Sequence, residues 1–273
     1  MLRRIAASLI AIASFLSAGT LARAQANAPQ SRVYRLAPSS TYQQGCFEPC
    51  MCPLMVAAPV RGTFRLVPTA IGDVFQFFTV QDVRWIVELP SSPIVHHVVG
   101  SGSYKISLGT NTRTHQLTLD LAIDQNLTQH FDSGLVPMNG PFPRIDITIS
   151  INGVWCLDTV FTLHARPLVW VNVGSSSVAW QGSPDSTGFD VARGDLGALR
   201  ASGGNFAAST VECLANGASA FSMPYAAVPT PGHGFYFIAR DTLGPTAQTW
   251  DEGDVAQIRS RDPSLQQASG SCP

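Results

Sequence analysis

Hydrophobic and polar residues alternate with a period of two along much of the first half of the chain. The clearest segments are Leu117–Ile123 and Ile145–Ile151, in which every second residue is leucine or isoleucine. Because successive side chains of a β-strand point to opposite faces, each segment has one apolar and one polar face. The pattern predicts about eight antiparallel strands between Ser31 and Arg166. Weaker copies of the alternation occur at Val60–Val67, Val74–Val80, Val83–Leu89, Tyr104–Leu108 and Leu157–Leu163.

So many half-apolar strands need partners that cover their apolar faces, and a single open sheet cannot cover all of them. We therefore expect residues 27–166 to form an N-terminal antiparallel β-sandwich or a closed barrel. The alternation changes at Arg166-Pro167, which predicts a domain boundary. Residues 167–273 are the second predicted domain.

The second half combines short strands with brief helical signals. Ser209, followed three residues later by Glu212, fits a capping box and predicts a short helix or helical turn through Val211–Leu214. Asp262 and Pro263 fit the cap and the first position of another short helix. The whole chain is thus expected to be all-β with short helical insertions. The expected strands of this half are Val169–Val173, Ser177–Trp180, Thr187–Arg193 and Gly232–Asp241.

The beginning of the chain has the features of a secretory signal peptide. The pair Arg3-Arg4 precedes an apolar run over residues 5–18, which is too short for a comfortable membrane span. Either Ala22-Arg23-Ala24 or Ala24-Gln25-Ala26 fits the cleavage site. Residues 1–26 are therefore predicted to be removed. The mature protein is expected to be exported, as a secreted, periplasmic or cell-surface protein.

Charge and hydropathy exclude two classes of partner. The formal net charge is -1, and the chain has no basic run, so nucleic-acid binding is not expected. No segment after the N-terminal apolar run reaches the length of a membrane-spanning helix, so no span is expected in the mature chain.

The cysteines predict a disulfide framework, because an even number of cysteines in an exported chain favours disulfides. The first three form a cluster with C-x3-C-x-C spacing. We expect one disulfide within this cluster and a second between its remaining member and Cys156, with Cys213–Cys272 as the third pair. Alternatively, the cluster binds copper or zinc, since thiolates suit soft metals; this requires reduced thiols. The six cysteines are Cys46, Cys50, Cys52, Cys156, Cys213 and Cys272.

Three other residues make a speculative binding set. His115 and His130 flank the regular strand over 117–123, and Asp132 follows closely. Neutral imidazole and carboxylate can bind a metal together. The alternative is that these are surface or hydrogen-bonded structural histidines, and nothing in their spacing requires a cofactor or metal.

Motifs of catalysis are absent from the sequence. The chain has neither a G-x-S-x-G elbow nor an H-E-x-x-H zinc motif, so it offers no catalytic residue and enzyme activity is not favoured. The tripeptide Arg193-Gly194-Asp195 follows a predicted strand and is interpreted as a turn. Trp250, in a predicted loop, is the tryptophan that best fits an accessible sugar-stacking platform.

The second half resembles a fibronectin type III domain over roughly residues 168–262. The resemblance rests on Val178-Ala179-Trp180, Gly188–Arg193 and Pro231–Arg240, with Thr242-Leu243-Gly244 as the following turn. It implies a two-sheet sandwich with Trp180 in its core. The segment from Leu196 to Gly217 departs from the family pattern.

The first half is similar to uncharacterised exported bacterial β proteins, through Gly45–Pro53 and Gly62-Thr63-Phe64. That similarity implies no activity.

These observations favour an exported non-catalytic binding or interaction protein whose ligand no motif identifies. One alternative is a carrier of a small apolar ligand, in which the N-terminal strands close into a barrel without a plug of large side chains. Another alternative is a soft-metal protein or enzyme built on the cysteine cluster.

Overall fold

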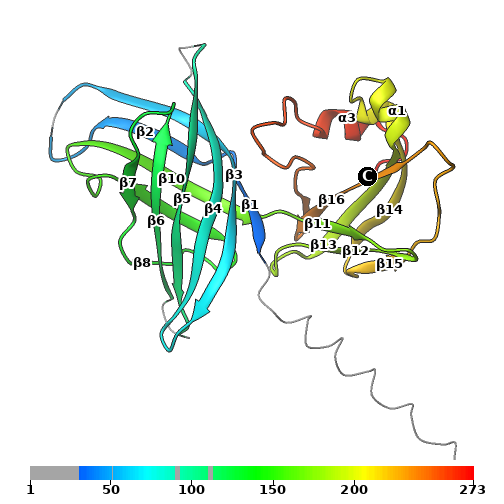
Figure 1. Cartoon of the computed structure of the whole chain (residues 1–273), viewed down its shortest axis with the longest axis horizontal. Helices are drawn as coiled ribbons and strands as arrows, with labels where there is room; N and C mark the ends of the chain where they lie inside the picture. The colour runs from blue at the N-terminus through cyan, green and yellow to red at the C-terminus, as the bar shows by residue number, and fades with distance from the viewer. Residues whose placement is uncertain (1–30, 51, 90–92, 110–112) are drawn as a thin grey trace, which may run out of the picture. The chain divides into compact units, whose positions relative to one another are not determined.

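The structure is a computed structural model that describes residues 31–50, 52–89, 93–109 and 113–273 (Figure 1). The predicted signal peptide, residues 1–26, lies outside the described residues. About 54% of the structure is strand and 7% is helix, and the strands form antiparallel sheets. The predicted all-β class is therefore confirmed.

A sheet of ten strands occupies the chain up to Pro167 (Figure 1). From β2 to β7 the neighbours follow chain order, and β9 follows β7. β10 pairs with β9 along one edge and with β2 along the other, so the sheet closes into a barrel. The strands are β1 (Arg32–Leu36), β2 (Thr41–Cys46), β3 (Met55–Ile71), β4 (Phe75–Glu88), β5 (Val95–Ser107), β6 (Thr114–Ile123), β7 (Gln129–Asp132), β8 (Val136–Pro137), β9 (Ile145–Ser150) and β10 (Leu157–Pro167).

The two strands expected at Val74–Val80 and Val83–Leu89 are one long strand, β4, with an irregularity in the middle. The register of β4 against β5 shifts between Val80 and Val83, and Asp82 has a positive φ of 52°. Such a bulge resets the alternation, so that Val80 and Val83, an odd number of residues apart, are both buried. The sequence showed the change of phase, which is caused here by a bulge and not by a turn.

Large aromatic side chains fill the barrel interior. The ring of Phe161 lies 5.2 to 5.5 Å from the rings of Tyr42, Trp85 and Phe131, measured between centroids. Phe64 contacts Trp85 at 6.3 Å. These side chains interlock across the strands, so the described part of the interior is a packed core.

The rest of the chain forms two smaller antiparallel sheets and three short helices. One sheet has the order β11-β12-β15 and the other has the order β14-β13-β16-β17. Trp180 and Phe189 are buried between them with Val178 and Val191. The strands are β11 (Trp170–Val173), β12 (Ser177–Gln181), β13 (Gly188–Asp195), β14 (Thr210–Ala218), β15 (Ser222–Pro224), β16 (Phe235–Leu243) and β17 (Thr246–Ala247). The helices are α1 (Leu196–Ala201), α2 (Phe206–Ser209) and α3 (Asp262–Gln267).

The helix predicted from the capping box at Ser209 is wrong. Ser209 ends α2 instead, and its hydroxyl donates to the carbonyl oxygen of Asn205 at 2.9 Å. The following residues form β14, in which Glu212 pairs with Arg193 and Cys213 with Ala192. Pairing with β13 therefore outweighs the local capping signal.

Candidate functional site

The cysteines of the predicted framework form three disulfides, which are Cys46–Cys52, Cys50–Cys156 and Cys213–Cys272. All six cysteines of the chain are therefore paired. Disulfides of this number are typical of exported proteins. Paired sulfurs are not the thiolates that soft metals require, so the cluster offers no thiolate ligand in this form. Among the described residues, no group of three or more histidine, cysteine or acidic side chains could hold a metal ion.

The structure does not bring His115, His130 and Asp132 together. His115 is buried inside the barrel, where its Nδ1 lies 3.1 Å from the Tyr104 hydroxyl, and burial lowers its pKa. His130 is on the outer face of β7, with Nδ1 2.8 Å from a carboxylate oxygen of Asp120. A strand places alternate residues on opposite faces, and the inward position of His115 separates it from the other two.

The Asp132 carboxylate has hydrogen-bond partners in β6 and in the turn that follows β7. Its carboxylate accepts hydrogen bonds from Gln116 at 2.8 Å, from the Thr118 hydroxyl at 3.2 Å and from the Gly134 amide at 3.0 Å. Partial burial raises the pKa of this carboxyl, but these hydrogen bonds outweigh burial, and the net pKa is lowered. The side chain thus ties β6 to β7 and to the turn that follows.

The tripeptide at 193–195 is held within the fold. The Arg193 guanidinium stacks on Phe235 at 4.4 Å and pairs with Glu212 at 3.1 Å. The Asp195 carboxylate accepts a hydrogen bond from the Ala198 amide at 2.7 Å and caps α1. These contacts explain the tripeptide as the end of β13 and the start of a helix.

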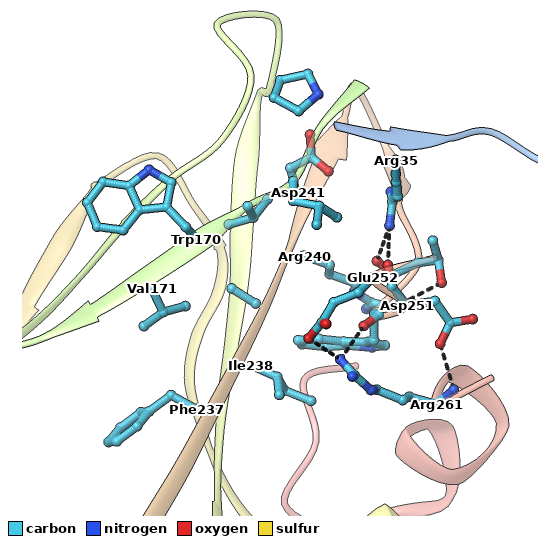
Figure 2. Close-up of a pocket in the computed structure, with 16 residues that line it drawn as sticks. Arg35, Trp170, Val171, Phe237, Ile238, Arg240, Asp241, Asp251, Glu252 and Arg261 are labelled. Atoms are coloured by element: carbon cyan, nitrogen blue, oxygen red, sulfur yellow. Dashed lines mark hydrogen bonds and ion pairs between the residues drawn. The ribbon is translucent and has the colours of Figure 1, made fainter. Parts of the chain in front are cut away.

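A cavity of about 270 Å³ lies along β16 (Figure 2). Residues 237–241 of β16 form one wall, and residues 167–171, which lead into β11, form another. The segment 249–252 and the side chains of Arg35 and Arg261 complete it. The cavity therefore lies where β1, the second group of sheets and the C-terminal segment meet, and we take it as the candidate binding site.

Arg35, from the barrel strand β1, is bound to the C-terminal segment. Its guanidinium donates to the carbonyl oxygens of Asp251 at 2.6 Å and Thr249 at 3.3 Å (Figure 2). Burial lowers the pKa of Arg35, and the nearby Asp241 carboxylate opposes this effect. Two backbone oxygens thus accept hydrogen bonds from one guanidinium nitrogen of this partly buried cation.

The acidic residues of the segment 249–252 are bound as well. Arg261 donates to Glu252 at 3.0 Å and to the Trp250 carbonyl at 3.4 Å. The Asp251 carboxylate accepts hydrogen bonds from the Gln257 side chain at 2.6 Å and from the Arg261 amide at 2.7 Å. The segment is therefore fixed to the residues that follow it.

On β16 itself, the two charged residues of the cavity also have partners. Arg240 pairs with the buried Asp190 at 2.8 Å and covers the Trp250 ring at 4.6 Å. Asp241 accepts a hydrogen bond from Ser186 at 2.8 Å and lies 3.6 Å from Arg166. The idea of Trp250 as an accessible platform is wrong, because its side chain is buried beneath Arg240.

A larger groove of about 620 Å³ adjoins the cavity and shares Arg35, Thr249 and Asp251 with it. Its other walls include Leu36, Pro59 and the exposed ion pair between Arg61 and Glu88. Because they share these residues, the cavity and the groove lie next to each other along the C-terminal segment.

Sequence reasoning did not find this site, because its parts are far apart in the chain. Arg35 lies 216 positions from Asp251, with which it shares a hydrogen bond. Trp250 is the cavity residue that the sequence favoured as a platform for a ligand. No local spacing could have shown that Arg35, Arg240 and Arg261 converge.

Comparison with known proteins identifies no relative. The chain matches no protein family, and no curated protein or solved structure is detectably similar to it. The resemblance of residues 168–262 to fibronectin type III domains stays a prediction, as does the domain boundary at Arg166-Pro167. No helix within the described residues is both long and apolar enough to cross a membrane.

Proposed function

We propose that this chain is an exported, non-catalytic binding protein whose ligand occupies the cavity along β16. One observation carries the proposal. The described lining of the cavity contains no histidine, serine, cysteine or lysine, so it has no paired nucleophile and base of the kind that nucleophilic catalysis uses. All six charged side chains of the lining are bound to other groups of the protein. These side chains are Arg35, Arg240, Asp241, Asp251, Glu252 and Arg261.

Export is part of the proposal because the three disulfides would be lost in a reducing compartment. The apolar-carrier alternative is less well supported, since it expects an open barrel interior, whereas Trp85, Phe131 and Phe161 meet inside. The soft-metal alternative needs free thiols, and the cysteine cluster is disulfide-bonded.

Two exposed tryptophans provide a matched pair of variants. Trp170 lines the cavity and is 42% exposed, whereas Trp155 is 61% exposed and is not among the lining residues. The protein would be probed with a phage library of random peptides, a glycan array and a series of fatty acids. We expect binders in at least one class, with affinity lowered roughly tenfold by Trp170→Ala and unchanged by Trp155→Ala.

Three results would contradict the proposal. The first is that no probe class binds, and the second is that Trp155→Ala and Trp170→Ala have equal effects. The third is that a bound probe is chemically converted, which would show catalysis. Circular dichroism and thermal unfolding of both variants would show that each one is folded.

A further inference from the structure

The cavity along β16 exposes an edge of the sheet as well as side chains. β16 pairs with β13 over eight consecutive residues, from Phe235 to Thr242. On its other side, β17 pairs only with Thr242 and Leu243. No other strand of the described residues pairs with that outer edge. Most of β16 therefore has a partner on one side and a cavity on the other.

Two hydrogen bonds show which backbone groups face the cavity. The Asp241 carbonyl accepts a hydrogen bond from the Gln248 amide on the outer side at 2.9 Å. The next carbonyl, that of Thr242, accepts one from Thr187 on the β13 side at 2.8 Å. The register of β16 against β13 is continuous, so the direction alternates along the strand. The N–H and C=O groups of Phe237 and Ala239 therefore point outward.

The lining of the cavity agrees with this direction. Five consecutive residues of β16, 237–241, line it, although side chains of a strand alternate between faces. A hollow that touches every residue of a strand lies along its edge. Figure 2 shows the side chains of Phe237 and Ile238 on opposite sides of β16, with Val171 on the side of Phe237.

The hydrophobic core of the two small sheets is open at the same place. Phe237 and Ala239 pack against this core from β16, and Val169 and Val171 do so from the other wall, but all four are only partly buried. A neighbouring strand on the outer edge of β16 would bring side chains over these four residues. The edge is thus an incomplete part of a sandwich and not a finished surface.

Two devices that protect a free strand edge, a proline or lysine on the strand and a bulge, are missing here. Residues 235–239 contain no proline and no lysine, and the β13–β16 ladder has no bulge. Proteins normally block free edges by such devices, because unpaired N–H and C=O groups attract another strand. The one charged residue nearby, Arg240, is bound to Asp190.

We infer that this edge binds an extended, uncharged peptide segment of another protein, which adds as a strand beside β16. This inference rests on the proposed function and names its ligand class. Free backbone groups at Phe237 and Ala239 supply the hydrogen bonds of β-augmentation. The charged residues of the cavity cancel in number and are already paired, so a charged peptide side chain would find no partner. The partly open core takes an apolar side chain at every second position.

Ala239→Pro tests the inference on the protein itself. Proline removes the outward N–H of this residue but no hydrogen bond of the β13 ladder. Ala239→Ser keeps the N–H and nearly the same size, and is the matched control. Peptides would be selected from a random phage library on the wild-type protein. We expect them to alternate apolar residues and to lose roughly tenfold or more in affinity for Ala239→Pro, and clearly less for Ala239→Ser, which keeps the N–H group.

Amide hydrogen exchange provides the second measurement. Without peptide, the amides of Phe237 and Ala239 should exchange faster than those of Ile238 and Arg240, which face β13. A selected peptide should slow the first two roughly tenfold or more and change the other two little. A peptide that is N-methylated on the amides facing β16 should fail to bind.

The outcomes separate this inference from the proposed function. One outcome is that probes bind in a way that depends on Trp170, but bind equally to wild type and Ala239→Pro and do not protect the amides of Phe237 and Ala239. That outcome would overturn strand addition but leave the proposal of a binding protein in place. Absence of any cavity-dependent binder would overturn both. Protection of the two amides that rises with protein concentration alone would make the occupant a second copy of this chain, and would overturn the assignment to another protein.

Discussion

The barrel and the sheets that follow it differ in how they treat the edges of a β-sheet, where backbone N–H and C=O groups lack a partner strand. Among the described residues of the barrel, 25 are buried in one core, and β10 closes the ring so that each strand of the ring has two neighbours. In the two smaller sheets, one cluster has five buried residues and the other has four. There β16 keeps most of one edge unpaired.

The comparison shows where each region obtains its stability. The barrel relies on apolar burial, since large aromatic and aliphatic side chains fill it. The barrel also carries two disulfides, Cys46–Cys52 and Cys50–Cys156. The second region combines its smaller core with one disulfide, Cys213–Cys272, and with the Arg240–Asp190 pair. The region that does not close its sheet therefore has an unpaired strand edge and the smaller core.

The largest expected effect is in the barrel core. Phe161→Ala removes a ring that contacts three other aromatic rings, so it should lower the free energy of unfolding by about 3–5 kcal/mol. Phe237→Ala, at the open edge of the smaller core, should cost clearly less, because its side chain is only partly buried. Urea unfolding of both variants is the measurement. Equal losses would mean that the two cores are equally complete.

Removal of the Cys213–Cys272 disulfide comes next. The two cysteines are 59 positions apart, and the chain-entropy relation for a loop of this length gives about 4 kcal/mol. The double serine variant should therefore unfold its smaller sheets at lower denaturant, while barrel amides stay protected in hydrogen exchange. The double serine variant at Cys46 and Cys52, six positions apart, is the control and should lose only about 2 kcal/mol. A larger loss for the control would argue against this difference between the regions.

The smallest effect concerns acid. The hydrogen bonds of Asp132 lower its pKa in the folded state, so its contribution to stability is present above the unfolded pKa of about 3.9 and is lost as the pH falls through the folded pKa. Asp132→Asn should therefore be less stable than wild type near neutral pH and should lose less stability on acidification. Urea midpoints at neutral pH and at about pH 3 test this. A variant with the same pH dependence as wild type would contradict the assignment.

The sequence predicted the barrel strands better than the binding site, and the reason is physical. The alternation at Leu117–Ile123 and Ile145–Ile151 arises because one face of each strand is buried, and these segments correspond to β6 and β9. The continuous β4 was read as two strands, because the bulge at Asp82 changes the phase just as a turn does. Both the correct prediction of these two strands and the wrong division of β4 depended on residues within a single strand.

The site depends on contacts that leave no local pattern. Arg35 and the segment 249–252 are far apart in the sequence and meet only in the folded chain, and the open edge of β16 follows from the early end of β17. The capping signal at Ser209 failed for a related reason, since pairing of Glu212 and Cys213 with β13 decides the structure there. Prediction from sequence thus succeeded where the pattern within one strand determines which face is buried. It failed where contacts between segments far apart in the sequence determine the structure.

The connectivity of the cysteine cluster has a consequence for how the protein matures. Along the chain, the first cysteine after Cys46 is Cys50, yet Cys46 is bonded to Cys52. Cys50 is bonded to Cys156, which lies 106 positions later. Oxidation in order of synthesis would join Cys46 to Cys50 and leave both native bonds unmade. A chain that oxidises in that order reaches the native connectivity only by thiol–disulfide exchange, which an isomerase or a redox buffer that permits reshuffling would support.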